Sequence, residues 1–157
     1  MIEVCRCSFT IAHSWEVSKR MKKKGERYLR GWEKLMEITG ESGRKTMRRW
    51  EEFSPDMCDY IVEFAYGDIY SRRVLDSRQR MTVTITALIT LGGCEKELAV
   101  HIGSALNVGL SPHEVVEIVL QCIPYIGFPR VTGAMSVVRS VFEERAIPFP
   151  TDLSEST

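Results

Sequence analysis

The sequence predicts an all-α protein, and three observations support that fold class. Apolar residues recur at steps of three and four along most of the chain. Helix-capping residues stand directly before several of these runs. Only one segment in the body of the chain alternates like a β-strand, and a single strand has no partner for its backbone groups. With 157 residues, 44% of them apolar, the chain fits one compact helical domain or one unit of an oligomer.

Two helices are predicted in the first half of the chain. The first begins at Glu26 and ends at Gly40, a glycine of the kind that stops helices. Its apolar face comprises Tyr28, Leu29, Trp32, Leu35 and Met36. Ser54 and Pro55 then supply an N-cap and a proline at the first helical position. The apolar face of this second helix comprises Met57, Tyr60, Ile61, Phe64 and Ala65.

The strand-like segment runs from Met81 to Thr86, where apolar and β-branched polar residues alternate. Propensity alone favours a strand there. The surrounding segments are all helical in pattern, so no neighbouring strand is expected to pair with it. We therefore predict a buried helix over residues 76–91, with Asp76 as its N-cap.

Two further long helices are predicted, and the first of them has a clear start signal. Ser111 and Glu114 form a capping box, with the glutamate three residues after the serine. The apolar stripe behind it comprises Val115, Ile118, Val119 and Cys122. Pro124 and Pro129 interrupt the chain before the final helix. The apolar face of that helix comprises Val131, Ala134, Met135, Val138, Val141 and Phe142.

The chain divides into three parts. Residues 1–20 read as a leader of doubtful origin, because their polarity is mixed and the codons for residues 15–17 can contain GGAGGT, a ribosome-binding sequence, shortly before Met21. We expect Met21 to be the natural start. Residues 21–146 are predicted to form a single helical domain, and residues 147–157 a C-terminal tail.

Composition limits the partners. Lys and Arg together number 21, as do Asp and Glu, so no nucleic-acid partner is expected. No window is apolar enough to span a membrane, and the N-terminus lacks a secretory pattern, which favours a cytoplasmic protein without a membrane partner. The five cysteines are irregularly spaced, which favours reduced thiols and no metal site.

One segment groups residues that can carry chemistry. On a helix over residues 94–108, Cys94, Glu97 and His101 stand at i, i+3 and i+7, so a thiol, a carboxylate and an imidazole share one face. A carboxylate one turn away can orient the imidazole and raise its pKa. Spacing alone gives more weight to the plainer alternative, a salt-bridged helix surface with a buried cysteine.

Other polar residues are weaker candidates. Arg72 and Arg80 stand near the start of the predicted helix over residues 76–91 and can bind a substrate carboxylate by charge-assisted pairs. Arginines at helix ends are, however, usually solvated. Tyr125 lies between Pro124 and Pro129. Its aromatic ring is expected either to line a pocket or to fill the hydrophobic core.

The sequence resembles the gamma-carboxymuconolactone decarboxylases from about Tyr28 to Glu143. The matching stretches are RYLRGWEKLMEITGE, FAYGDIYSRRVLDSRQR, CEKELAVHIGSALNVGLSPHEVVEIVLQ and YIGFP. The family pattern has a histidine before a helix ending in Asn-x-Gly, here His101 and residues 107–109, and a Tyr-x-Gly-x-Pro turn, here residues 125–129. The resemblance implies an all-helical fold that assembles as a ring of dimers, commonly a hexamer. It also implies cofactor-free decarboxylation of a lactone in the degradation of aromatic compounds.

The sequence departs from the family pattern at three places. Tyr70 stands where the family usually has tryptophan, Arg73 and Val74 where it has Pro-Gly, and Cys94 where it tends to have arginine. The same superfamily includes accessory proteins of alkyl hydroperoxide reductase with the pattern Cys-x-x-Cys-x-x-x-His. Here Glu97 occupies the position of the second cysteine, so a dithiol cycle within this motif is excluded.

The resemblance implies a mechanism and leaves two alternatives. Arg80 binds a carboxylate of the substrate, carbon dioxide leaves, and His101, oriented by Glu97, returns a proton to the carbanion. The first alternative is a thiol peroxidase that reduces a hydroperoxide at Cys94, with Glu97 and His101 as proton relay. The second is a helical oligomer that has lost the chemistry.

Overall fold

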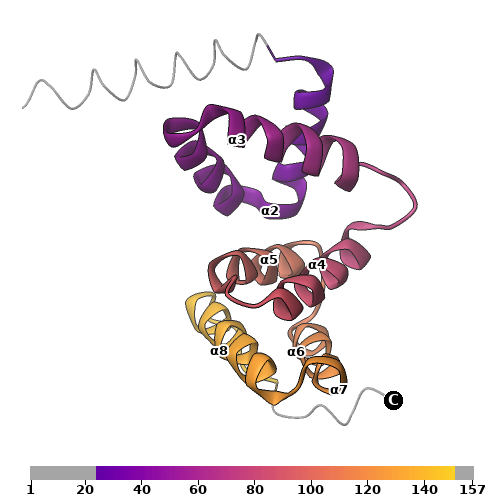
Figure 1. Ribbon diagram of the computed structural model, residues 1–157, viewed down its shortest axis with the longest axis vertical. Coiled ribbons are helices and arrows are strands. Elements are labelled where there is room, and N and C mark those ends of the chain that lie inside the picture. The colour runs from indigo at the N-terminus through magenta and orange to yellow at the C-terminus, as the bar shows by residue number, and fades with distance from the viewer. Residues whose placement is uncertain (1–23, 151–157) are drawn as a thin grey trace, which may run out of the picture.

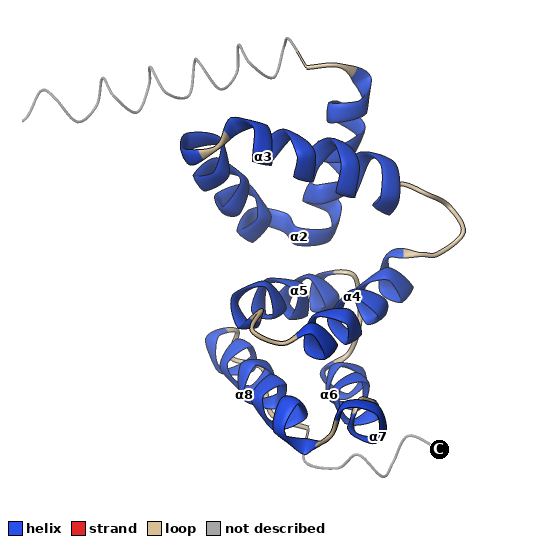
Figure 2. Ribbon diagram, in the orientation of Figure 1, coloured by secondary structure: helices blue, strands red, loops and turns tan. Residues whose placement is uncertain are grey.

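The computed structural model describes residues 24–150, and their regular structure is entirely helical (Figure 1; Figure 2). The predicted all-α fold is therefore confirmed. The leader assigned to residues 1–20 and the end of the predicted tail lie outside the described residues. The elements are α2 (Glu26–Phe53), α3 (Pro55–Tyr60), η1 (Ile61–Tyr70), α4 (Ser77–Leu91), α5 (Glu95–Asn107), α6 (Pro112–Gln121), α7 (Ile123–Ile126) and α8 (Phe128–Glu144).

The elements form two groups in Figure 1. Helix α2, helix α3 and η1 lie together in one group, and α4 to α8 form the other, with residues 71–76 connecting them. Helix α5 joins the groups, because it packs against α2 as well as α4 and α8. A cavity between α2, α3, η1 and α5 is therefore bounded by both groups. None of the described helices is long and apolar enough to cross a bilayer.

Helix α2 bends sharply at Gly40. The backbone there has φ 59° and ψ −141°, a left-handed conformation that glycine adopts without steric cost. The predicted break at Gly40 is confirmed, but the prediction that the helix ends there is wrong. A second helical stretch continues to Phe53 and turns back over the cavity that the site occupies.

The segment η1 is a π-helix of 10 residues. Its contact with α2 is more extensive than the contact between any other two of the described elements. The two backbones meet closely at Gly31, where a Cβ atom would stand 2.0 Å from the Val62 carbonyl oxygen. Arg27 of α2 binds Asp68 of η1 through Nε, at 3.0 Å from Oδ1. This close crossing holds η1 against α2, and both elements contribute residues to the cavity lining.

Helix α4 confirms the prediction made against strand propensity. Asp76 accepts a hydrogen bond from the Gln79 amide at 2.8 Å, and the Gln79 side chain accepts one from the Asp76 amide. Met81, Ile85 and Ile89 are buried at four-residue spacing. The threonine hydroxyls of residues 82, 86 and 90 donate to carbonyl oxygens one turn earlier. Local hydrogen bonding and burial of one helical face therefore outweigh β propensity here.

The remaining helices also match the predicted signals. Ser111 accepts a hydrogen bond from the Glu114 amide at 3.1 Å, which completes the predicted capping box of α6. Gly127, with φ 77°, separates α7 from α8 between the two prolines. The buried core of this half includes Ile102, Val115, Val119, Val138 and Phe142.

Candidate functional site

The candidate site is a cavity of about 720 Å³ between α2, α3, η1 and α5. Its apolar lining comprises Leu35, Met47, Trp50, Phe53, Met57, Ile61, Ala65 and Val100. Its polar lining comprises Thr39, Thr46, Arg49, Tyr66, Tyr70, Lys96, Glu97 and His101. A mostly apolar cavity with a few convergent polar groups is typical of small-molecule sites.

His101 is the most unusual residue in this cavity. Its Nδ1 atom is buried and has no hydrogen-bond partner among the described residues. Burial lowers the pKa of His101, and the nearby Glu97 carboxylate raises it by a smaller amount. The ring is therefore held mainly neutral near pH 7. A buried polar atom without a partner is costly unless a ligand or water satisfies it, which makes this position a candidate for ligand binding.

Glu97 lies one turn before His101 on α5 and lines the same cavity, as predicted. The carboxylate is exposed, and no hydrogen bond joins it to the imidazole in the described structure. Glu97 was expected to raise the pKa of His101, and its charge does so. The net shift has the opposite sign because desolvation is the larger effect.

Cys94 does not share this cavity, which corrects the predicted grouping of thiol, carboxylate and imidazole. It is the N-cap residue of α5, with φ −120° and ψ 35°, so its side chain does not follow the helical register. Its Sγ atom donates to the Gly92 carbonyl oxygen at 3.6 Å. The thiol lines a separate cavity of about 190 Å³ formed with Arg130 and the start of α8.

The three other predicted binding residues also lie outside the cavity lining. Arg80 donates from Nε to the Leu75 carbonyl at 3.1 Å and from Nη2 to the Arg72 carbonyl at 2.9 Å, so it stabilises the loop before α4. Arg72 is exposed on that loop. Tyr125 is 78% exposed on α7. Arg80, Arg72 and Tyr125 therefore do not line this cavity, and their assignment to substrate binding stays a prediction.

Two cations that the sequence analysis did not single out line the cavity. Arg49 comes from the second stretch of α2, and Lys96 from the first turn of α5. Neither forms a salt bridge or side-chain hydrogen bond within residues 24–150. The only sequence signal for Arg49 was the basic run from Lys19 to Arg49, which a solvated helix face explains equally well. Both cations are open to an anionic ligand.

Two tyrosines of η1 complete the polar lining. Tyr66 and Tyr70 stack with ring centroids 5.0 Å apart. The hydroxyls of Tyr70 and Thr84 lie within hydrogen-bond distance, at 2.7 Å. Burial raises the pKa of both tyrosines, so both stay protonated at neutral pH. Tyr66 has no side-chain hydrogen bond to the described residues and can donate to a ligand.

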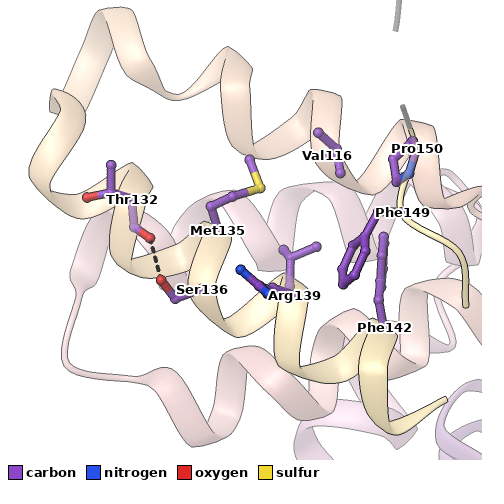
Figure 3. A pocket seen from close by; sticks show the side chains of 9 residues that line it. Val116, Thr132, Met135, Ser136, Arg139, Phe142, Phe149 and Pro150 are labelled. Carbon is purple, nitrogen blue, oxygen red and sulfur yellow. Dashed lines mark hydrogen bonds between the residues drawn. The ribbon is translucent and has the colours of Figure 1, made fainter. Parts of the chain in front are cut away.

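A second large cavity, of about 610 Å³, lies between α6, α8 and the residues that follow α8 (Figure 3). Its polar groups already have partners: Ser136 donates to the Thr132 carbonyl at 3.0 Å, and Arg139 binds Glu143 at 2.9 Å. This cavity therefore lacks the unpaired groups that distinguish the site at His101. Within residues 24–150, no cluster of three or more His, Cys, Asp or Glu residues is placed to hold a metal ion.

Comparison with known proteins shows which family the chain resembles. The sequence model of the carboxymuconolactone decarboxylase family matches residues 55–140, more than half of the chain. The chain is 33% identical to a 4-carboxymuconolactone decarboxylase of Acinetobacter baylyi over 78% of its own length and 91% of that protein. It is 33% identical to a nitrosuccinic acid decarboxylase of Metarhizium robertsii over 68% of its length and 74% of that protein. An uncharacterized 15.0 kDa protein of Paracoccus denitrificans is 28% identical over 62% of the chain and 74% of its own length.

Proposed function

Because the chain belongs to the carboxymuconolactone decarboxylase family, we propose that it decarboxylates a carboxylated unsaturated lactone, without a cofactor, in the degradation of aromatic compounds. The observation that carries the proposal concerns His101, which lines a large cavity together with Arg49 and Lys96 and whose buried Nδ1 atom has no hydrogen-bond partner among residues 24–150. Relatives named as decarboxylases of two different acids support the reaction type.

Substrate binding is assigned to Arg49 and Lys96, in place of Arg72 and Arg80. A guanidinium or ammonium group binds a carboxylate by charge-assisted hydrogen bonds, which are stronger than neutral ones. A bound ligand that covers the apolar lining displaces water from it and strengthens these interactions. Once the substrate anion is bound beside the imidazole, its charge favours the protonated form and raises the pKa of His101.

The chemistry then needs two steps. The bond between the ring carbon and the carboxylate breaks, carbon dioxide leaves, and the electron pair spreads toward the lactone carbonyl as a dienolate. Cations and the Tyr66 hydroxyl stabilise that negative charge. Protonated His101 then donates its proton to the carbanion and takes another from solvent, so one proton is consumed for each carbon dioxide released. Glu97 supports the charged imidazole electrostatically.

The two alternatives have less support. A thiol peroxidase that uses His101 as proton relay needs the thiol and the imidazole in one site, but Cys94 lines a different cavity. A helical oligomer without catalytic activity leaves the buried Nδ1 atom of His101, which has no partner among the described residues of one copy, without a role.

We expect the protein to act in the cytoplasm as a ring of dimers, commonly a hexamer, as its family resemblance implies. Large side chains exposed on α3 and η1 support an interface between copies, since Tyr60 is 69% exposed and Phe64 58% exposed. Light scattering on the full chain tests the assembly, and a monomer at micromolar concentration contradicts it.

The function is tested by incubating the wild-type protein with a panel of unsaturated lactones that carry one or two carboxylates. Release of carbon dioxide is measured without added metal or cofactor. Turnover of at least one lactone supports the proposal. Absence of carbon dioxide from every lactone, with the protein folded, contradicts it.

A further inference from the structure

The cavity at His101 has two chemically different walls. Helix α5 supplies Lys96, Glu97 and His101 to one wall. The end of α2, α3 and η1 supply the other, which is mostly apolar and carries Arg49 and Tyr66 besides the side chains of Trp50, Phe53, Met57, Ile61 and Ala65. A ligand that satisfies both walls needs a polar end and an apolar body.

The charges of the lining favour one carboxylate in the ligand. Arg49 and Lys96 are positive, Glu97 is negative, and His101 is mainly neutral because burial lowers its pKa. One anionic group can be compensated by these cations. A second one would lie near the Glu97 carboxylate or against the apolar wall, where it would be desolvated without a partner.

The apolar wall is larger than a small ring needs. The cavity volume of about 720 Å³ lies in the range of sites for drug-sized ligands, about 300 to 1,000 Å³. Phe53 is 84% exposed and Met57 42% exposed, so much of the apolar lining is open for a ligand to cover. The rings of Trp50 and Phe53 lie 6.4 Å apart and tilted by 55°, which offers an aromatic surface.

We propose that the ligand of this cavity is an amphipathic monocarboxylate. Its single carboxylate binds beside Arg49, Lys96 and His101, and an apolar substituent lies along Trp50, Phe53 and Met57. For catalysis this inference rests on the proposed function, since the bound carboxylate is the group that leaves. The binding preference itself does not require turnover.

The test measures dissociation constants by calorimetry for hexanoate, octanoate and decanoate, and for octanedioate, in which a second carboxylate replaces the terminal methyl group of octanoate. Burying one methylene group contributes about 0.8 kcal/mol, so affinity is expected to rise about fourfold per added methylene. Octanoate is expected to bind more tightly than octanedioate. Equal affinity along the series, or tighter binding of octanedioate, would overturn the proposal.

A matched pair of variants tests which residues contact the apolar part of the ligand. Met57→Asn removes an apolar side chain from the cavity without adding charge, in the first turn of α3, where asparagine is tolerated. Val83→Asn makes a comparable change at a residue that is 60% exposed on α4 and outside the cavity. The chain-length dependence should weaken in Met57→Asn and persist in Val83→Asn. Equal dependence in both variants would refute the assignment to this wall.

Failure of this inference can be told apart from failure of the proposed function. If the monocarboxylate series binds as expected and no lactone releases carbon dioxide, the binding preference stands and the decarboxylase assignment fails. If a lactone with two carboxylates and no apolar substituent turns over while the series shows no length dependence, the reaction stands and the amphipathic ligand is excluded. If a second copy of the chain covers the apolar wall, the length dependence is also absent and the inference fails.

Discussion

Glu97 and His101 lie one turn apart on α5 and line the same cavity, yet the carboxylate is exposed while the Nδ1 atom of the imidazole is buried. The Glu97 charge raises the pKa of His101, but desolvation lowers it more. The free protein therefore keeps a mainly neutral, largely buried imidazole near pH 7. An anion that binds in this cavity favours the protonated imidazole and therefore raises the pKa of His101.

The low pKa of His101 predicts a pH dependence of stability. Since folding disfavours the charged imidazole, the unfolded chain binds more protons at acidic pH, and the free energy of unfolding falls as the pH drops below the ordinary histidine pKa of about 6.5. His101→Gln lacks this contribution and should lose less stability between pH 7 and pH 5. Urea denaturation of both proteins at the two pH values measures the difference. An identical loss in both would show that His101 is not desolvated.

Arg49, which has no salt bridge within residues 24–150, predicts a selective binding defect. Arg49→Gln should raise KM for the carboxylic acid substrate by about threefold to tenfold, the range expected for loss of a partly exposed charge-assisted contact. Arg48→Gln is the matched control, because Arg48 is the preceding residue on α2, is exposed and does not line the cavity. Steady-state kinetics on both variants gives the comparison. Equal effects would remove Arg49 from the site.

The close crossing of α2 and η1 predicts a stability effect at Gly31. A Cβ atom there would stand 2.0 Å from the Val62 carbonyl oxygen, so Gly31→Ala must separate the two elements. We expect a loss of about 1–3 kcal/mol in the free energy of unfolding. Gly133→Ala on α8 is the control, since a Cβ atom there meets nothing within 4 Å, and it should gain up to about 1 kcal/mol. Denaturant unfolding that shows no loss for Gly31→Ala would contradict this packing.

The separate position of Cys94 predicts that the thiol is dispensable. Cys94→Ser should keep the wild-type kcat for carbon dioxide release, because Cys94 lines the cavity of Arg130 and not that of His101. The same variant tests the peroxidase alternative in a hydroperoxide reduction assay. A large fall in kcat for decarboxylation would mean that thiol and imidazole act together after all.

The fold could be predicted from the sequence wherever local signals agreed with burial. The predicted N-cap at Asp76 and the predicted capping box at Ser111 both form, and the burial of Met81 and Ile85 at four-residue spacing outweighs a strand-like alternation. Gly40 was identified as a break, but periodicity does not reveal that a second helical stretch resumes beyond a left-handed glycine. The cavity wall that this stretch supplies was therefore missed.

The site could be predicted only in part. Glu97 and His101 share a cavity because both lie within the regular part of α5, where helical spacing decides direction. Cys94 fails the same spacing rule because its backbone at the N-cap is not helical. Arg49 reaches the site through the bend at Gly40 and the fold of α2 over α5, a relationship that no local pattern contains.

The most direct test of the account compares carbon dioxide release by wild-type protein, His101→Gln and His113→Gln on the same lactone at saturating concentration. His113 is exposed on α6, outside the cavity, so it is the matched control. Loss of a general acid predicts a fall in kcat of about 100-fold to 10,000-fold for His101→Gln and none for His113→Gln. A folded His101→Gln protein that releases carbon dioxide at the wild-type rate would contradict the assignment of proton return to this buried imidazole.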